Sequence, residues 1–160
     1  MNCATRRAVP SDAAAACDIV RRSITELCYD DHQGDPESLA SWLANKTPNN
    51  FERWIGSGTH VALVAERDSE LVGFALLSLG GSIALLYVSP DARFTGVSKH
   101  LLSALEHAAI AAGIQELKLE SSATALRFYK RCGYVSTGPP FKAFGITMGY
   151  PMSRRMSTSS

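Results

Sequence analysis

Hydrophobic and polar residues alternate with two different periods along the chain, and the change of period separates helices from strands. Over residues 96–112, apolar residues recur every three or four positions, with polar residues between them. This spacing predicts an amphipathic helix. Over residues 114–120, Leu117 and Leu119 alternate with charged residues, which predicts a half-buried strand. A helix that joins two strands in this way favours parallel strands and a right-handed crossover.

The same reasoning predicts the remaining elements. Strands are expected at residues 4–8, 60–67, 70–79, 82–88, 134–136 and 144–152, and helices at 13–27, 37–44, 49–57 and 123–131. Residues 29–36 are expected to form a polar loop. Residues 71–88 carry no charge, but Gly80 and Gly81 interrupt them, so they are better interpreted as a hairpin than as a membrane span. The order indicates a mixed α/β fold with a single domain over residues 1–153 and a disordered tail over 154–160.

Composition narrows the functional classes. The 160 residues are 46% hydrophobic and 19% charged, with a formal net charge of +1, which is typical of a folded domain and argues against nucleic acid or an anionic membrane as partner. The four cysteines form no C-x-x-C pair and have no histidine at metal-ligand spacing, so we expect no metal and reduced thiols in a cytoplasmic protein. The N-terminus has no apolar segment typical of a signal peptide.

The stretch from Tyr87 to Leu102 contains the first sign of chemistry. A predicted strand runs through a turn around Gly96 into a helix N-terminus. The free N–H groups of a first helical turn, together with the helix dipole, form an anion site. We therefore expect a phosphate-bearing ligand here. A dinucleotide-binding turn of the G-x-G-x-x-G type is absent from the sequence.

Two motifs carry a resemblance to a known family. The first is Val88-Ser89-Pro90 followed by Arg93-Phe94-Thr95-Gly96-Val97-Ser98, and the second is Ala125-Leu126-Arg127-Phe128-Tyr129-Lys130-Arg131-Cys132-Gly133-Tyr134. In this order and spacing they resemble the GNAT superfamily of acyl-CoA-dependent N-acetyltransferases, over roughly residues 4–153. The resemblance implies a twisted, mostly antiparallel mixed sheet, helices on both faces, and a splay between the fourth and fifth strands.

The resemblance also implies a cofactor site. The coenzyme A pyrophosphate would lie on the backbone from Arg93 to Ser98, where Gly96 allows close approach. Its pantetheine arm would pair with the strand edge from Leu86 to Val88. The set implied to contact acetyl-CoA is Leu86, Tyr87, Val88, Arg93, Phe94, Thr95, Gly96, Val97, Ser98, Ser122 and Tyr129.

The implied reaction is direct attack by an amine on acetyl-CoA in a ternary complex. The Val88 N–H would hold the thioester carbonyl oxygen, and Tyr129 would act as the general acid toward the leaving thiolate. Family members often carry a Glu or His base on the strand before V-x-P, whereas this chain has Ser82 and Ala84 there.

The sequence therefore does not identify the general base. The candidates are Asp30, Asp31 and His32 in the polar loop and Glu120 at the end of its strand, beside a water relay or an acceptor amine of low pKa. The alternative function is a GNAT-like module that binds acyl-CoA without catalysis. The acceptor is expected to be a small-molecule or peptide amine, and a homodimer is compatible with the sequence because family members are often dimers.

Overall fold

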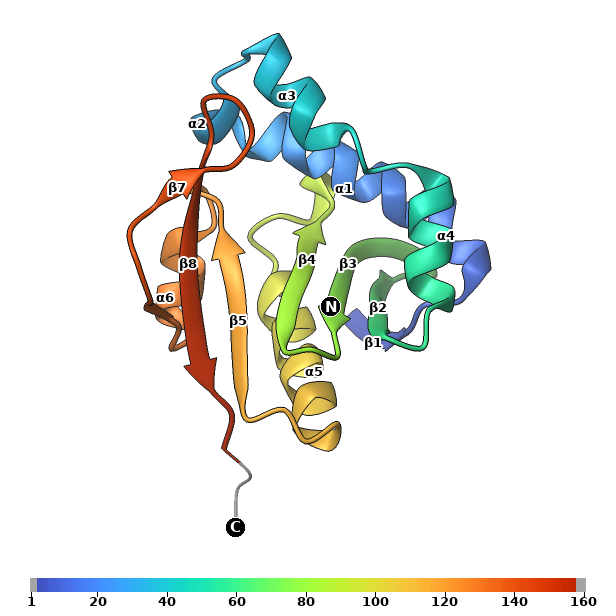
Figure 1. The fold of residues 1–160 in the computed structure, drawn as a ribbon. Helices are drawn as coiled ribbons and strands as arrows, with labels where there is room; N and C mark the ends of the chain where they lie inside the picture. The colour runs from blue at the N-terminus through green and yellow to red at the C-terminus, as the bar shows by residue number, and fades with distance from the viewer. Residues whose placement is uncertain (1–2, 158–160) are drawn as a thin grey trace.

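A mixed sheet with helices on both faces organises the chain (Figure 1). The computed structural model describes residues 3–157. Its strands are β1 (Cys3–Arg7), β2 (His60–Arg67), β3 (Glu70–Ser78), β4 (Ser82–Val88), β5 (Glu116–Ser121), β6 (Val135–Ser136), β7 (Phe141–Lys142) and β8 (Met148–Arg155). Its helices are α1 (Ala13–Leu27), α2 (Tyr29–His32), α3 (Pro36–Leu43), α4 (Pro48–Gly56), α5 (Val97–Ala111) and α6 (Leu126–Arg131), with single 3₁₀ turns η1 (Pro10–Asp12) and η2 (Pro90–Ala92).

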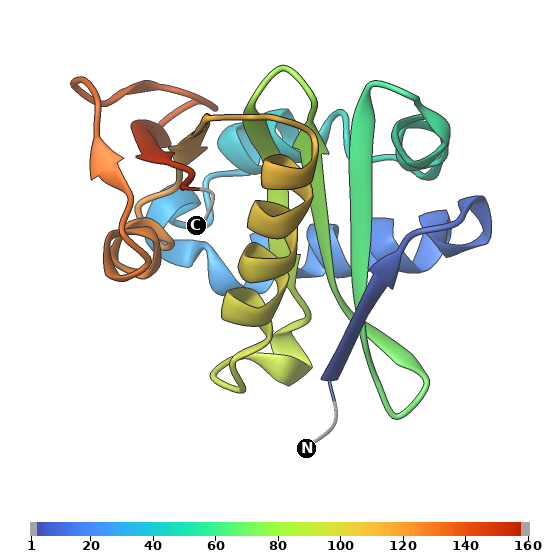
Figure 2. The same cartoon turned by 90° about the horizontal axis from the view of Figure 1, so that it is seen from below.

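The strand order is β1-β2-β3-β4-β5-β8-β6, with β7 paired to β8. The ends of this order, β1 and β6, lie at opposite sides of the molecule (Figure 2). All neighbours are antiparallel except β4 and β5, which are parallel and pair only at Ser82 and Lys118. Beyond that point the two strands diverge (Figure 1). The mixed, mostly antiparallel sheet with a splay between its fourth and fifth strands is therefore confirmed.

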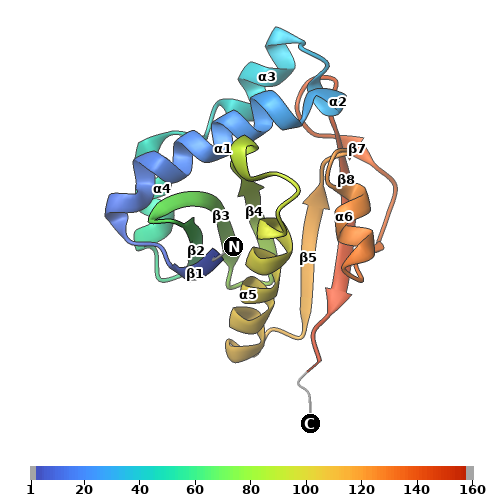
Figure 3. The same ribbon diagram turned by 180° about the vertical axis from the view of Figure 1, so that it is seen from behind.

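Each face of the sheet has its own core because successive strand residues point to opposite faces. On one face, Leu63 and Ala65 of β2 pack with the apolar side of α5. Helices α5 and α6 lie in front of this face in Figure 3. On the other face, Ala62 and Val64 pack with α1, α3 and α4. The predicted amphipathic helices thus cover both faces.

Several predicted boundaries are wrong. Arg154 and Arg155, expected in a disordered tail, are the last residues of β8 and pair with Leu117 and Glu116 of β5. The rest of that predicted tail reaches into residues 158–160, which lie outside the described part. Residues 29–32, expected in a loop, form α2, and β7 was not predicted. Within residues 3–157, no helix combines the length and apolarity that crossing a membrane requires.

Candidate active site

The turn into α5 has the geometry of an anion site. Gly96 is the N-cap residue and has φ +83°, a left-handed conformation that glycine adopts without strain. A Cβ there would meet nothing within 4 Å, so space above the turn is open. The first N–H groups of the helix, those of Val97, Ser98 and Lys99, precede the first intrahelical bond, which His100 donates to the Gly96 carbonyl. These N–H groups and the helix dipole favour a bound anion.

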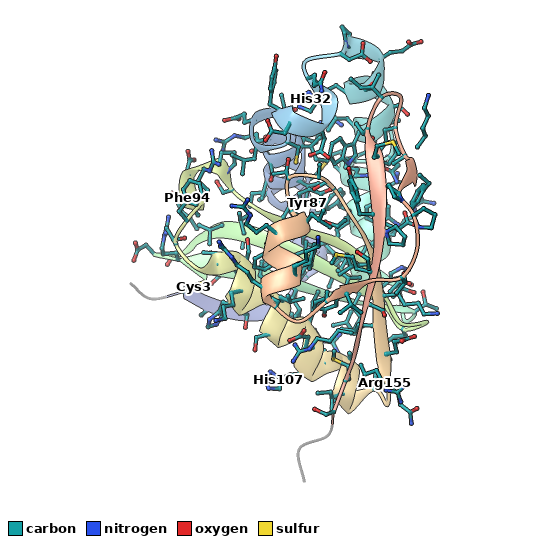
Figure 4. All side chains as sticks on the ribbon, turned by 90° about the vertical axis from the view of Figure 1, so that its left-hand side faces the viewer. Cys3, His32, Tyr87, Phe94, His107 and Arg155 are labelled. Atoms are coloured by element: carbon teal, nitrogen blue, oxygen red, sulfur yellow. The ribbon has the colours of Figure 1, made fainter. Side chains whose placement is uncertain are left out.

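The loop before this turn is exposed to solvent. The Arg93 guanidinium lies 4.3 Å from the centroid of the Phe94 ring, and Phe94 is 90% exposed with φ 64°. Figure 4 shows Phe94 at the periphery, whereas Tyr87 lies inward among packed side chains. The Thr95 hydroxyl donates to the Ala92 carbonyl and ties the loop to η2. Arg93 and Phe94 are therefore accessible to a ligand that reaches the turn.

The edge of β4 that faces β5 offers backbone hydrogen-bonding groups. The Ser89 N–H donates to the Val72 carbonyl at 2.8 Å, which puts the adjacent pair of Gly73 and Val88 in a non-hydrogen-bonded position. The N–H and C=O of Val88 therefore point away from β3, toward the splay. Leu86, two residues earlier in the same register, has the same orientation.

Tyr129 lies in the core on the α5 side of the sheet. It is 6% exposed, and Leu86 and Val88 pack against the same cluster. Burial, with a smaller effect of Cys132, raises the pKa of Tyr129 above its ordinary value of 10. The phenol is therefore protonated at neutral pH, as a general acid must be.

A cleft of about 740 Å³ opens on the other face, between the diverging strands. Tyr87 of β4 and Glu120 of β5 line it, together with Ser122, and Trp42 and Phe144 form an aromatic wall. The Trp42 and Phe144 rings stack at 5.7 Å between centroids and 10° between planes. Neither Val88 nor Tyr129 is among the described residues that line this cleft. The expected site residues therefore divide between the two faces of the splay.

Two of the candidate bases, His32 and Asp31, have structural roles. The Nε2 atom of His32 lies 3.1 Å from the Ile24 carbonyl, and its Nδ1 accepts the Gly34 N–H at 3.0 Å. His32 is 2% exposed, so both ring nitrogens are used inside the fold. The Asp31 carboxylate accepts the N–H groups of Ala123 and Thr124 at 2.6 and 3.2 Å. It thus caps the turn before α6, and neither side chain has an unused basic atom.

Asp30 is exposed on α2 and is not among the described residues that line the cleft, whereas Glu120 is exposed and lines it. The Glu120 carboxylate has no hydrogen bond or ion pair with any residue in 3–157. Ser122, also at the cleft, accepts the Ala125 N–H at 3.1 Å within the turn that precedes α6. Burial raises the pKa of Cys28, which neighbours Tyr87, to about 12, so this thiol is not a nucleophile at neutral pH.

A contact joins α3, which carries Trp42, to the β7–β8 loop, which carries Phe144. The Ser38 hydroxyl donates to Asp35 at 2.6 Å and accepts the Ile146 N–H at 2.9 Å. Gly145 has φ +56°, and a Cβ there would collide with Ser38. This contact holds Phe144 against Trp42. Sequence reasoning missed Phe144 and Lys46 as cleft residues, and no local motif marks either.

The sheet is open, its parallel strands β4 and β5 diverge, and the turn into α5 can bind a phosphate group. These features define a GNAT-type α/β protein. The model of the acetyltransferase (GNAT) domain family matches residues 30–156. The chain therefore belongs to the GNAT acetyltransferase family.

Solved structures resemble the whole fold. A GCN5-related N-acetyltransferase from Rhodopseudomonas palustris has 29% sequence identity and a TM-score of 0.85, over 97% of this chain and 96% of that one. The PaiA N-acetyltransferase from Thermoplasma acidophilum, solved with coenzyme A, has 20% identity and a TM-score of 0.80, over 97% and 99%.

A curated relative resembles part of the chain. An IAA acetyltransferase from Azospirillum brasilense is 32% identical over 85 residues, which is 48% of this chain. The match spans 56% of that relative's own length.

Proposed function

We propose that this protein transfers an acetyl group from acetyl-CoA to an amine by direct attack in a ternary complex. The observation that carries the proposal is the α5 turn: a left-handed Gly96 below open space, followed by free N–H groups at a helix N-terminus, beside a strand edge whose Val88 N–H is unpaired by β3. The N–H groups at the helix N-terminus fit a pyrophosphate, and the Val88 N–H fits a thioester carbonyl. The coenzyme A in the Thermoplasma relative supports the same assignment of cofactor.

In the proposed mechanism each group has a single task. The Val88 N–H donates to the thioester carbonyl oxygen as negative charge develops on it. The Glu120 carboxylate accepts a proton from the attacking amine, directly or through water. The amine nitrogen forms the new C–N bond, the C–S bond breaks, and the Tyr129 hydroxyl donates its proton to the leaving thiolate. The high pKa of the Cys28 thiol argues against an acyl-cysteine intermediate.

Two measurements test the proposal. Acetyl-CoA at one hundred times its dissociation constant should raise the free energy of unfolding by about 2.7 kcal/mol, and NAD should not. Incubation with acetyl-CoA and a panel of amines should release the coenzyme A thiol and yield acetylated amine in equal amounts. Binding of acetyl-CoA without any transfer would instead favour the non-catalytic alternative.

A further inference from the structure

Lys46 is a buried lysine in the cleft wall that the proposed mechanism does not use. It lies between α3 and α4, is 5% exposed, and is among the residues that line the cleft. Its backbone carbonyl accepts from the Arg21 guanidinium at 2.8 Å and from the Cys17 thiol at 3.3 Å. Helix α1 therefore fixes the backbone from which the Lys46 side chain extends.

The Lys46 ammonium has few partners for a buried cation. Its Nζ donates to the Asn45 side-chain oxygen at 2.8 Å and lies 5.5 Å from the centroid of the Phe144 ring. An ammonium has three donors, and no carboxylate of the described chain pairs with this one. Burial alone lowers the pKa of Lys46 to about 8, so at pH 7 most of the side chain is still charged. A buried ammonium of this kind would be stabilised by an anion that binds it.

The other cation in the cleft wall is different. The Lys118 side chain is 70% exposed and pairs with Glu116 at 3.9 Å, so solvent and a carboxylate already satisfy it. Lys46 is buried in the cleft wall and pairs with no carboxylate of the described residues, and the surface next to it is the aromatic wall of Trp42 and Phe144. A ligand with an apolar body and an anionic end complements both features.

We infer that Lys46 binds a carboxylate of the acceptor, so that the acceptor is an amine that also carries a carboxylate. The inference rests on the proposed function, because it assigns an acceptor to that reaction. Tyr87 neighbours Trp42, Trp42 stacks on Phe144, and Phe144 contacts Lys46. These rings line the cleft from Tyr87, which adjoins Val88, to Lys46. An acceptor whose carboxylate is several bonds from its amine, such as a dipeptide or an ω-amino acid, fits this arrangement.

Binding tests the anion site without any need for acetyl transfer. Calorimetric titration compares 3-phenylpropanoate with 3-phenylpropanamide, two ligands of the same shape that differ in charge. The wild-type protein should bind the carboxylate at least about tenfold more tightly, as a charge-assisted hydrogen bond implies. Lys46→Met should abolish this preference, Lys46→Arg should keep it, and Lys118→Met should leave it unchanged. Equal binding of the two ligands by the wild type, or the same loss in Lys118→Met, would overturn the assignment.

Turnover tests the acceptor class. The dipeptide Gly-Phe and its C-terminal amide present the same amine, and the wild type should acetylate the free acid with a kcat/KM at least about tenfold higher. Lys46→Met should reduce this ratio to near one. Equal turnover of both peptides would overturn the inference and leave the proposed function standing. Lys46-dependent carboxylate binding with no acetylation of any amine would refute the proposed function and keep the anion site.

Discussion

The buried charge of Lys46 should cost stability, and replacing it with methionine should recover that cost. Methionine has nearly the same length and volume and no charge. Lysine ordinarily has a pKa of 10.5, and burial lowers it to about 8 in this fold. The difference corresponds to about 3 kcal/mol against the charged form. Loss of the contact with the Phe144 ring offsets about 1 kcal/mol of the gain, while Asn45 is exposed and finds water.

We therefore expect Lys46→Met to raise the free energy of unfolding by about 2 kcal/mol at pH 7, or the melting temperature by about 4–8 °C. The direction in which this stability difference changes with pH follows from proton linkage. Below pH 8 the lysine is charged in both states, so the full cost is present. Between pH 8 and 10.5 the folded state loses its proton first, and the wild type gains stability as pH rises. Above pH 10.5 the lysine is neutral in both the folded and the unfolded state, and the higher stability of the methionine variant disappears.

Urea unfolding followed by circular dichroism at pH 7, 9 and 10.5 measures this difference. Tyrosine and cysteine titrations are common to both proteins and cancel in the comparison. Lys118→Met, at a side chain that is 70% exposed, serves as the control and should change stability by about 0.5 kcal/mol or less. The reasoning is refuted if Lys46→Met destabilises the fold at pH 7, or if its effect is the same at all three pH values.

Three further substitutions test the proposed site. Tyr129→Phe should lower kcat about 10²-fold and leave the acetyl-CoA dissociation constant unchanged, because it removes only a proton donor; an unchanged kcat would exclude that role. Glu120→Gln should lower kcat/KM for the amine about 10²-fold and recover at high pH, where the amine is already deprotonated; a loss that is equal at all pH values would contradict a base. Gly145→Ala should cost about 1–3 kcal/mol and raise the KM for the amine but not for acetyl-CoA, because it separates the β7–β8 loop from Ser38; equal effects on both KM values would contradict a role confined to the acceptor side.

Elements defined by local pattern were predictable from the sequence. Helix α1 and strands β2 and β4 have the predicted bounds because turns and an uninterrupted apolar period delimit them. The C-terminal end was not predictable in this way. Ser153, Arg154 and Arg155 are polar, yet pairing with β5 satisfies their backbone and extends β8. A strand partner distant in sequence decides such a boundary, and local periodicity does not contain it.

In the candidate site, too, the features set by local sequence were predictable and those set by distant contacts were not. The turn at Gly96 was visible in the sequence because one glycine and a following amphipathic helix define it locally. The roles of Asp31 and Lys46 were not visible. Asp31 was a candidate base, and its contacts with Ala123 and Thr124 are separated from it by more than ninety residues. Lys46 is flanked by Asn45 and Thr47, so its polar surroundings in sequence indicate exposure, whereas folding buries it beneath Phe144.

Transfer of an acetyl group to an amine is tested most directly by the formation of its two products. The purified protein is incubated with acetyl-CoA and Gly-Phe, and mass spectrometry follows the dipeptide while a thiol reagent follows coenzyme A. We expect acetylated dipeptide and free coenzyme A thiol in equal amounts, with Tyr129→Phe about 10²-fold slower. Thiol release without acetylated product, or no transfer to any amine at saturating acetyl-CoA, would contradict acetyl transfer to an amine.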